Sequence, residues 1–75
     1  MSHDGSEKLV MMANQIGQFF ASQREATRVP GIADHIRKFW EPRMREKIFA
    51  HLDAGGAGLT PVVREALESL RQKTP

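Results

Sequence analysis

The chain has 75 residues, a formal net charge of +2 and no cysteine. This length allows one domain at most, and the lack of cysteine excludes disulfide bridges and thiolate metal sites. A lone core in a chain this short rarely stabilises the fold by more than about 3–5 kcal/mol. The length therefore argues against a self-contained enzyme and indicates one part of a larger assembly.

The absence of cysteine, of export signals and of a long apolar run predicts a soluble, cytoplasmic protein that does not cross a membrane. No apolar run approaches the roughly 18 residues of a membrane span. Residues 1–7 lack the basic and apolar regions of a signal peptide.

The first predicted helix covers about residues 7–23, after a flexible tail at residues 1–5. Either Ser6, or Asp4 together with Glu7, is expected to cap its start. Gly17 lies beside the apolar stripe, and we interpret it as a tolerated weak point rather than as a close helix crossing. The stripe has helical spacing and comprises Leu9, Met12, Ala13, Ile16, Phe19 and Phe20.

Residues 24–30 show no apolar period, and we interpret them as a connection. Pro30 favours an extended residue before it and is expected near the start of a second helix, at about residues 31–40. Phe39 is expected in the core. The apolar positions of this helix are Ile32, Ile36, Phe39 and Trp40.

Pro42 predicts a break after Trp40 and the start of a third helix, because proline suits a first helical position and disrupts a helix interior. Its stripe comprises Met44, Ile48 and Leu52. Gly55 or Gly56 is expected to end it in a left-handed conformation.

A fourth helix is predicted from Thr60 and Pro61, as N-cap and first helical residue. Its stripe comprises Val62, Val63, Ala66, Leu67 and Leu70. Residues 73–75 form a second flexible tail. The sequence thus predicts an all-α fold of about four short amphipathic helices in one domain at 6–72, with no β-sheet.

Residue types that carry catalysis or bind metals are present but not grouped for either. His35 and His51 are 16 positions apart, unlike a helical zinc pair. The carboxylates alternate with basic residues, and we expect little room for a concave substrate pocket. The glycines at 55–58 precede a helix, but the Gly-Lys-Ser/Thr ending of a phosphate loop is missing, so a tight connection is favoured over phosphate binding. We predict no catalytic, cofactor-binding or metal-binding residue.

The segment 37–47 is the densest in charge and contains the only tryptophan. It holds five basic and two acidic residues. Tryptophan, arginine and methionine are enriched where proteins bind each other, and arginine with aromatic residues also suits phosphates and bases. A partner surface and a plain core with a solvated face are both open from these residues alone.

Three blocks of the chain resemble the small delta subunit of soluble, NAD-dependent, molybdenum-containing formate dehydrogenases. The most specific is the run from His35 to Met44, which includes Phe39-Trp40-Glu41-Pro42-Arg43-Met44. The others are Lys8 to Ile16, followed by Phe19 and Phe20, and His51 to Leu59, followed by Val63 to Leu67. Together they span roughly residues 8–67.

The resemblance implies a non-catalytic accessory subunit of a cytoplasmic complex. In that family the large alpha subunit holds a molybdenum bis-pyranopterin cofactor and iron–sulfur clusters. Other subunits hold FMN, bind NAD and carry further iron–sulfur clusters. The delta subunit has no known redox centre and is regarded as helping assembly, cofactor retention or stability.

We therefore expect this chain to bind no cofactor itself and to dock on other formate dehydrogenase subunits, chiefly the alpha subunit. The predicted contact residues are Arg37, Trp40, Pro42, Arg43, Met44 and Arg45. Trp40 and Met44 would be buried anchors, and the arginines would pair with acidic groups or carbonyls. The alternative is a small helical module that binds nucleic acid through the same segment.

Overall fold

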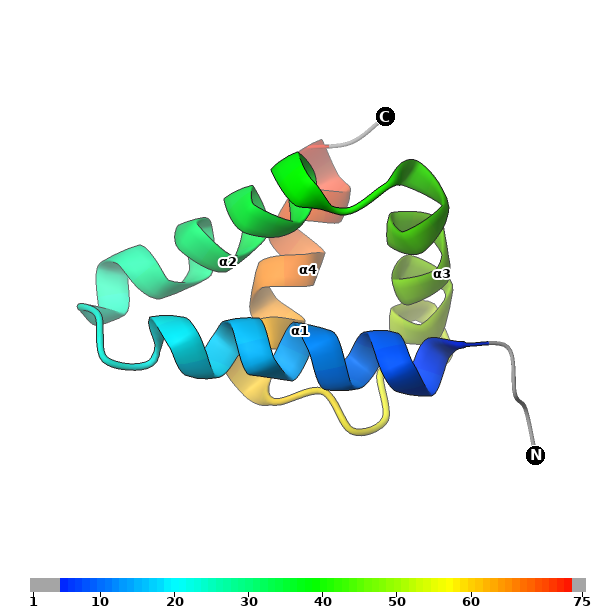
Figure 1. The fold of residues 1–75 in the computed structure, drawn as a ribbon, viewed down its shortest axis with the longest axis horizontal. Coiled ribbons are helices and arrows are strands. Elements are labelled where there is room, and N and C mark those ends of the chain that lie inside the picture. The colour runs from blue at the N-terminus through cyan, green and yellow to red at the C-terminus, as the bar shows by residue number, and fades with distance from the viewer. Residues whose placement is uncertain (1–4, 74–75) are drawn as a thin grey trace.

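The computed structural model describes residues 5–73, and these residues form four α-helices (Figure 1). They are α1 (Ser6–Phe20), α2 (Glu25–Phe39), α3 (Pro42–Asp53) and α4 (Pro61–Lys73). The all-α prediction is confirmed, and residues 5–73 contain no strand. Lys73, assigned to the C-terminal tail from the sequence, is the last residue of α4. Asp4 and its predicted cap lie outside the described residues.

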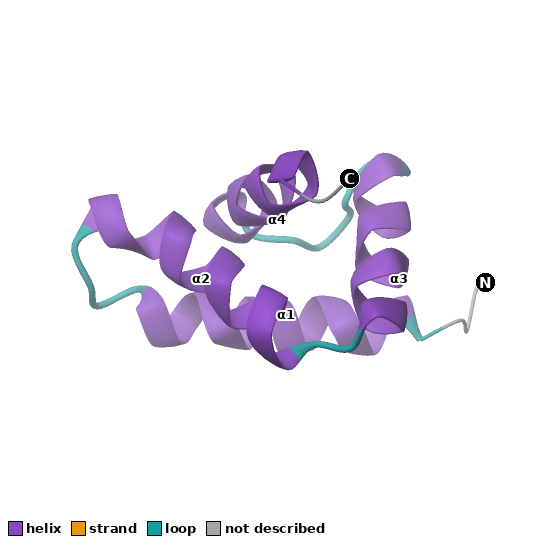
Figure 2. Ribbon diagram, turned by 90° about the horizontal axis from the view of Figure 1, so that it is seen from above, coloured by secondary structure: helices purple, strands orange, loops and turns teal. Residues whose placement is uncertain are grey.

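The helices are arranged around one core. α1 and α2 form a hairpin, α4 crosses behind it, and α3 stands at the end away from the hairpin loop (Figures 1 and 2). α4 packs most extensively against α2. None of the described helices is long and apolar enough to cross a bilayer.

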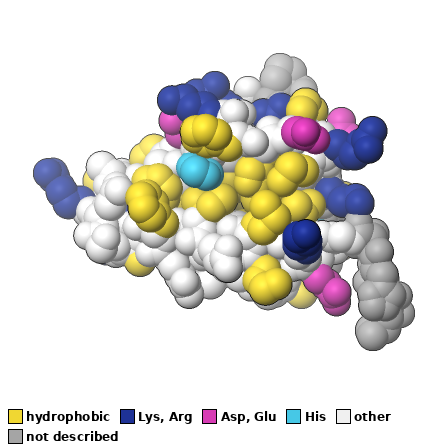
Figure 3. Space-filling view, in the orientation of Figure 1, with side chains coloured by type: hydrophobic (Ala, Val, Ile, Leu, Met, Phe, Trp, Pro, Cys, Tyr) yellow, Lys and Arg dark blue, Asp and Glu magenta, His cyan; other side chains and the backbone are white. Residues whose placement is uncertain are grey.

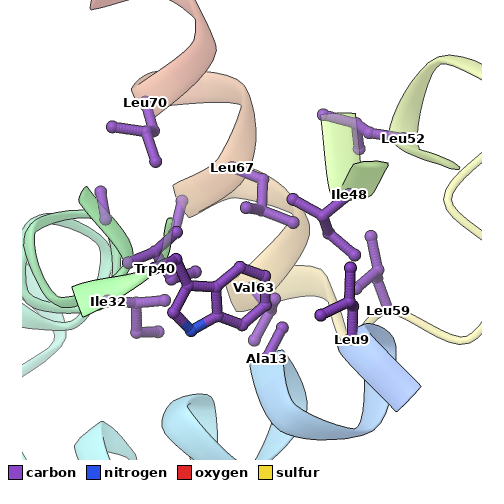
Figure 4. Close-up of a cluster of buried hydrophobic side chains, with 13 residues drawn as sticks. Leu9, Ala13, Ile32, Trp40, Ile48, Leu52, Leu59, Val63, Leu67 and Leu70 are labelled. Atoms are coloured by element: carbon purple, nitrogen blue, oxygen red, sulfur yellow. The ribbon is translucent and has the colours of Figure 1, made fainter. Parts of the chain in front are cut away.

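The core contains residues from all four helices and from the loop before α4, as Figure 4 shows. Its buried members are Leu9, Ala13, Ile32, Ala33, Ile36, Trp40, Ile48, Leu52, Leu59, Val63, Ala66, Leu67 and Leu70. Most come from the predicted stripes, because each helix turns its apolar side towards the others. No buried side-chain nitrogen or oxygen among the described residues lacks a hydrogen-bond partner.

α1 departs from its prediction in four ways. It ends at Phe20 rather than near residue 23, and Gly5 is its N-cap in a left-handed conformation (φ 93°) without a side-chain hydrogen bond. Phe19 is 71% exposed although it belongs to the predicted stripe. Gly17 is buried, and a Cβ there would lie 2.6 Å from Val63 Cγ2. The interpretation of Gly17 as a weak point was therefore wrong: it permits a close crossing of α1 and α4.

α2 begins at Glu25, so the predicted connection at 24–30 was wrong. Polar contacts secure its first turn: the Thr27 hydroxyl and backbone N–H both donate to the Arg24 carbonyl, at 2.8 and 2.9 Å, and Arg28 Nε donates to the Gln23 carbonyl at 2.8 Å. Pro30 lies inside this helix. Its missing N–H leaves the carbonyl four residues earlier without a helical partner, and that residue is exposed to water.

The boundaries of α3 and α4 match the proline and glycine signals. Pro42 begins α3 after an extended Glu41 (ψ 154°), and Pro61 begins α4. After α3, Gly55 N–H donates to the Leu52 carbonyl at 3.1 Å and Gly56 N–H to the His51 carbonyl at 2.9 Å. This pair of bonds is a Schellman motif. Both glycines have positive φ, 121° and 65°, which glycine adopts without steric cost.

Candidate docking surface

The six residues predicted to contact a partner lie where α2 turns into α3. Arg37 is in the last turn of α2, Trp40 follows its end, and the other four begin α3. The turn places them close together, but it gives them different environments. Each therefore has to be considered by its own contacts.

Trp40 is buried in the chain's own core, with 6% of the residue exposed. It lies in the cluster that contains Ile32 and Val63 (Figure 4). Its backbone is extended (φ −87°, ψ 138°), because α2 has ended at Phe39. The docking role of Trp40 stays a prediction, and only a small part of the ring is available for it.

Arg37 and Arg45 make contacts within the chain. Arg37 Nη2 lies 2.7 Å from Asp34 Oδ1, and Lys38 Nζ lies 3.1 Å from Asp34 Oδ2. Hydrogen bonds from Arg37, the larger cause, and from Lys38 hold the pKa of Asp34 below its usual range. Arg45 Nη1 donates to the Arg37 carbonyl at 2.9 Å and so satisfies one of the free carbonyls at the end of α2.

These contacts bear on the nucleic-acid alternative. At least three of the five basic residues in the segment 37–47, Arg37, Lys38 and Arg45, are engaged with groups of the same chain. Phosphate contacts would have to compete with those bonds. No contact in the described part of the chain specifically favours this alternative.

Pro42, Arg43 and Met44, at the start of α3, leave side-chain surface open to solvent, as does Arg37 at the end of α2. Pro42 and Arg43 are exposed, and Met44 is half-buried against the core. Arg43 and Met44 line a hollow of about 190 Å³ between the starts of α1 and α3, together with Gly5, Leu9 and Lys47. Leu9 and Met44 make its apolar part, and Arg43 and Lys47 bring positive charge.

Two exposed phenylalanines were missed as surface residues from the sequence. Phe39 is 70% exposed and Phe19 is 71% exposed, so the prediction that Phe39 belongs to the core was wrong. Met12 and Ile16 lie on the same side of α1 as Phe19 by helical spacing and are half-buried. Figure 3 shows hydrophobic side chains gathered on the face formed by α1, α2 and α3, with a histidine among them.

The glycine loop between α3 and α4 is a tight connection held by side chains. Arg64 donates from Nη1 to the Gly55 carbonyl at 2.9 Å and from Nη2 to the Gly56 carbonyl at 3.1 Å. Asn14 of α1 donates from Nδ2 to the Gly58 carbonyl at 2.9 Å and accepts from Thr60 N–H at 3.1 Å. Sequence reasoning did not assign these roles, because they join residues far apart in the chain.

The histidines and carboxylates form no metal site among the described residues: no group of three or more could hold an ion. His51 Nε2 donates to the Ala57 carbonyl at 2.7 Å. The ring of His35 lies 4.7 Å from the ring of Phe39.

A cleft is larger than the sequence led us to expect. An open cleft of about 560 Å³ lies between α2 and the end of α4 and is lined partly by Asp34, Arg37, Leu70 and Lys73. Its volume falls in the range of ligand sites. Its charged pair, Asp34 with Arg37, is already joined by a hydrogen bond.

Comparison with known families shows the family to which the chain belongs. The model of the NADH-dependent formate dehydrogenase delta subunit family (FdsD) matches residues 8–67. The chain belongs to this family. The match spans most of α1, all of α2 and α3, and the first half of α4. It therefore includes both exposed phenylalanines, the glycine loop and every residue that lines the outward-facing hollow of this delta subunit except Gly5. No curated protein and no solved structure was found to match the chain.

Proposed function

We propose that this delta subunit is a non-catalytic accessory subunit of a cytoplasmic NAD-dependent formate dehydrogenase. It docks on other subunits, chiefly the large molybdenum-containing alpha subunit, and supports assembly, cofactor retention or stability. The observation that carries the proposal is the family match over residues 8–67. The delta subunit binds none of the redox groups itself; the molybdenum bis-pyranopterin cofactor, iron–sulfur clusters, FMN and NAD belong to the other subunits.

The proposed mechanism is mutual stabilisation. A partner that binds only the folded form of a subunit shifts its folding equilibrium towards that form by mass action. The delta subunit would thereby keep a cofactor-bearing partner folded and closed without lowering the barrier to formate oxidation. Within the predicted contact set, Arg37, Pro42, Arg43 and Met44 supply surface open to solvent. Trp40 in the core and the hydrogen bond from Arg45 to the Arg37 carbonyl hold the turn that presents them.

Deletion of the delta subunit tests this function. The complex purified from cells that lack it should have lower formate-oxidising activity per molybdenum or lower thermal stability, and the wild-type chain supplied in trans should restore both. The subunit stoichiometry of the restored complex shows whether the chain remains bound. Unchanged activity per molybdenum together with unchanged stability of the complex would show that the accessory role is wrong.

A further inference from the structure

Among the described residues, Phe19 and Phe39 are the most exposed large apolar side chains, at 71% and 70%. Phe19 is the penultimate residue of α1, beside the loop of the hairpin, and Phe39 is the last residue of α2, at the opposite end of that helix. Burial of exposed phenylalanine surface against a partner favours association through the hydrophobic effect. Two such exposed rings give this small subunit a large apolar surface for binding a partner.

The chain holds each of the two rings in place. Phe19 makes an edge-to-face contact with Phe20, with centroids 5.2 Å apart and planes at 88°. Phe20 in turn lies against Gly31 of α2, where a Cβ would be 2.6 Å from Phe20 Cε1. At the other end, the ring of His35 packs against Phe39 at 4.7 Å with a 40° tilt. Side chains held in this way lose less conformational entropy on binding.

Apolar surface continues beside the two rings. Met12 and Ile16 share their side of α1 with Phe19 and are half-buried against the core. At the start of α1, the hollow with Leu9 and Met44 has the exposed Arg43 at its edge. The surface that includes Phe19, Ile16, Met12, Phe39 and the hollow with Arg43 is called the hairpin face below.

We propose that the hairpin face is the docking surface, with Phe19 and Phe39 as its anchors. Its occupant is an apolar segment of another formate dehydrogenase subunit that carries a carboxylate opposite Arg43. This inference rests on the proposed function and names the surface and the partner chemistry. The carboxylate follows from charge complementarity: the structure gives Arg43 no hydrogen bond or ion pair with the described residues, and it borders an apolar hollow. In a two-fold dimer each patch meets its own copy, so a second delta subunit would set the same cation-bordered patch against itself.

Substitution of the anchors within the assembled complex gives the first test. Phe19→Glu and Phe39→Glu should each lower the amount of delta subunit that co-purifies with a tagged alpha subunit by at least about tenfold, as expected for central aromatic contacts. Phe39→Leu should retain most of it. Met11→Glu is the matched control, because Met11 is 61% exposed but lies on a different side of α1 from Met12 and Ile16. Wild-type co-purification of both phenylalanine variants would overturn the proposal.

The charge is tested separately. Arg43→Glu should weaken association about threefold at low salt, with a smaller effect at high salt, as expected for an exposed charge pair at an interface. Arg24→Glu, at the exposed start of α2, is the control and should behave as wild type. An Arg43→Glu variant that binds as tightly as wild type at low salt would remove the carboxylate from the proposal.

Photo-crosslinking identifies the occupant and does not depend on a destabilising change. Phe39→p-benzoylphenylalanine in the intact complex should crosslink to another formate dehydrogenase subunit, at a peptide with apolar residues and an aspartate or glutamate. The same photoreactive residue at Met11 should give no such product. A crosslink to a second delta subunit, or none at position 39 in a complex that contains the chain, would overturn the proposal. Absence of the wild-type chain from the complex would instead contradict the proposed function.

Discussion

Gly17 and Val63 are in direct contact where α1 crosses α4: a Cβ on Gly17 would lie 2.6 Å from Val63 Cγ2. Val63 is fully buried, and its branched side chain has little freedom to move away. The missing side chain of Gly17 therefore sets how closely the two helices approach each other.

Gly17→Ala should destabilise the chain by up to about 2 kcal/mol, because overpacking costs about 1–3 kcal/mol and the gain in helix propensity, about 1 kcal/mol, offsets only part of that cost. Thermal unfolding followed by far-ultraviolet circular dichroism measures the effect. The exposed Gln18→Ala is the control in the same helix. In a Val63→Ala background, Gly17→Ala should become neutral or stabilising. A stabilising Gly17→Ala in the wild-type background would contradict the close crossing.

Asn14 should contribute strongly to the stability of the chain by holding the loop before α4 in place. Its side chain makes two hydrogen bonds, to the Gly58 carbonyl and from Thr60 N–H, across 44 and 46 positions of the chain. Asn14→Ala leaves both loop groups without this partner and should cost about 1–3 kcal/mol of unfolding free energy, measured by denaturant unfolding. Gln15→Ala, one exposed position along α1, should change stability by less than about 0.5 kcal/mol. Equal stability of the two variants would show that these hydrogen bonds contribute nothing.

Alanine substitutions of Trp40 and Phe39 should differ sharply in their effect on stability, although the two residues are neighbours in the sequence. Trp40→Ala opens a cavity in the core and should cost about 3–5 kcal/mol, comparable to all that a lone core of this size supplies. Phe39→Ala removes a 70% exposed side chain and should cost less than about 1 kcal/mol.

Thermal unfolding of both variants, with Trp40→Phe as the milder core substitution, checks this difference. A loss of docking in Trp40→Ala would then reflect unfolding of the delta subunit. Comparable unfolding temperatures for Trp40→Ala and Phe39→Ala would contradict the finding that Trp40 is buried in the core and Phe39 is exposed.

Asp34 should make stability weakly dependent on pH in the acid range. Hydrogen bonds from Arg37 and Lys38 lower its pKa in the folded chain, so the folded state binds the proton less readily than the unfolded state. The stabilisation is fully present above the unfolded pKa, about 3.9, and is lost as the pH falls through the lower folded pKa. Because Asp34 and its two basic partners are exposed, the effect on stability is small and salt-sensitive.

Unfolding midpoints measured across this acid range, with Asp34→Asn as the comparison, test the prediction. The difference between wild type and variant should be largest near neutral pH and should narrow in acid. A difference that widens with acidification would contradict the sign.

The sequence by itself determined the number and type of helices, most of the core and the family. These features depend on local signals: apolar residues at helical spacing, proline at the starts of α3 and α4, and the glycines after α3. The family resemblance also came from contiguous blocks, and the match over residues 8–67 agrees with them.

The tertiary structure decided which side chains of those helices are available to a partner. Helical spacing places Phe39 and Trp40 on the same apolar side, but α2 ends between them, and the extended backbone of Trp40 accompanies an indole buried in the core while Phe39 stays outside. Likewise, Gly17 and Pro30 each weaken a helix by propensity. Only the crossing with Val63, and the polar contacts that secure the start of α2, show why these residues are accommodated.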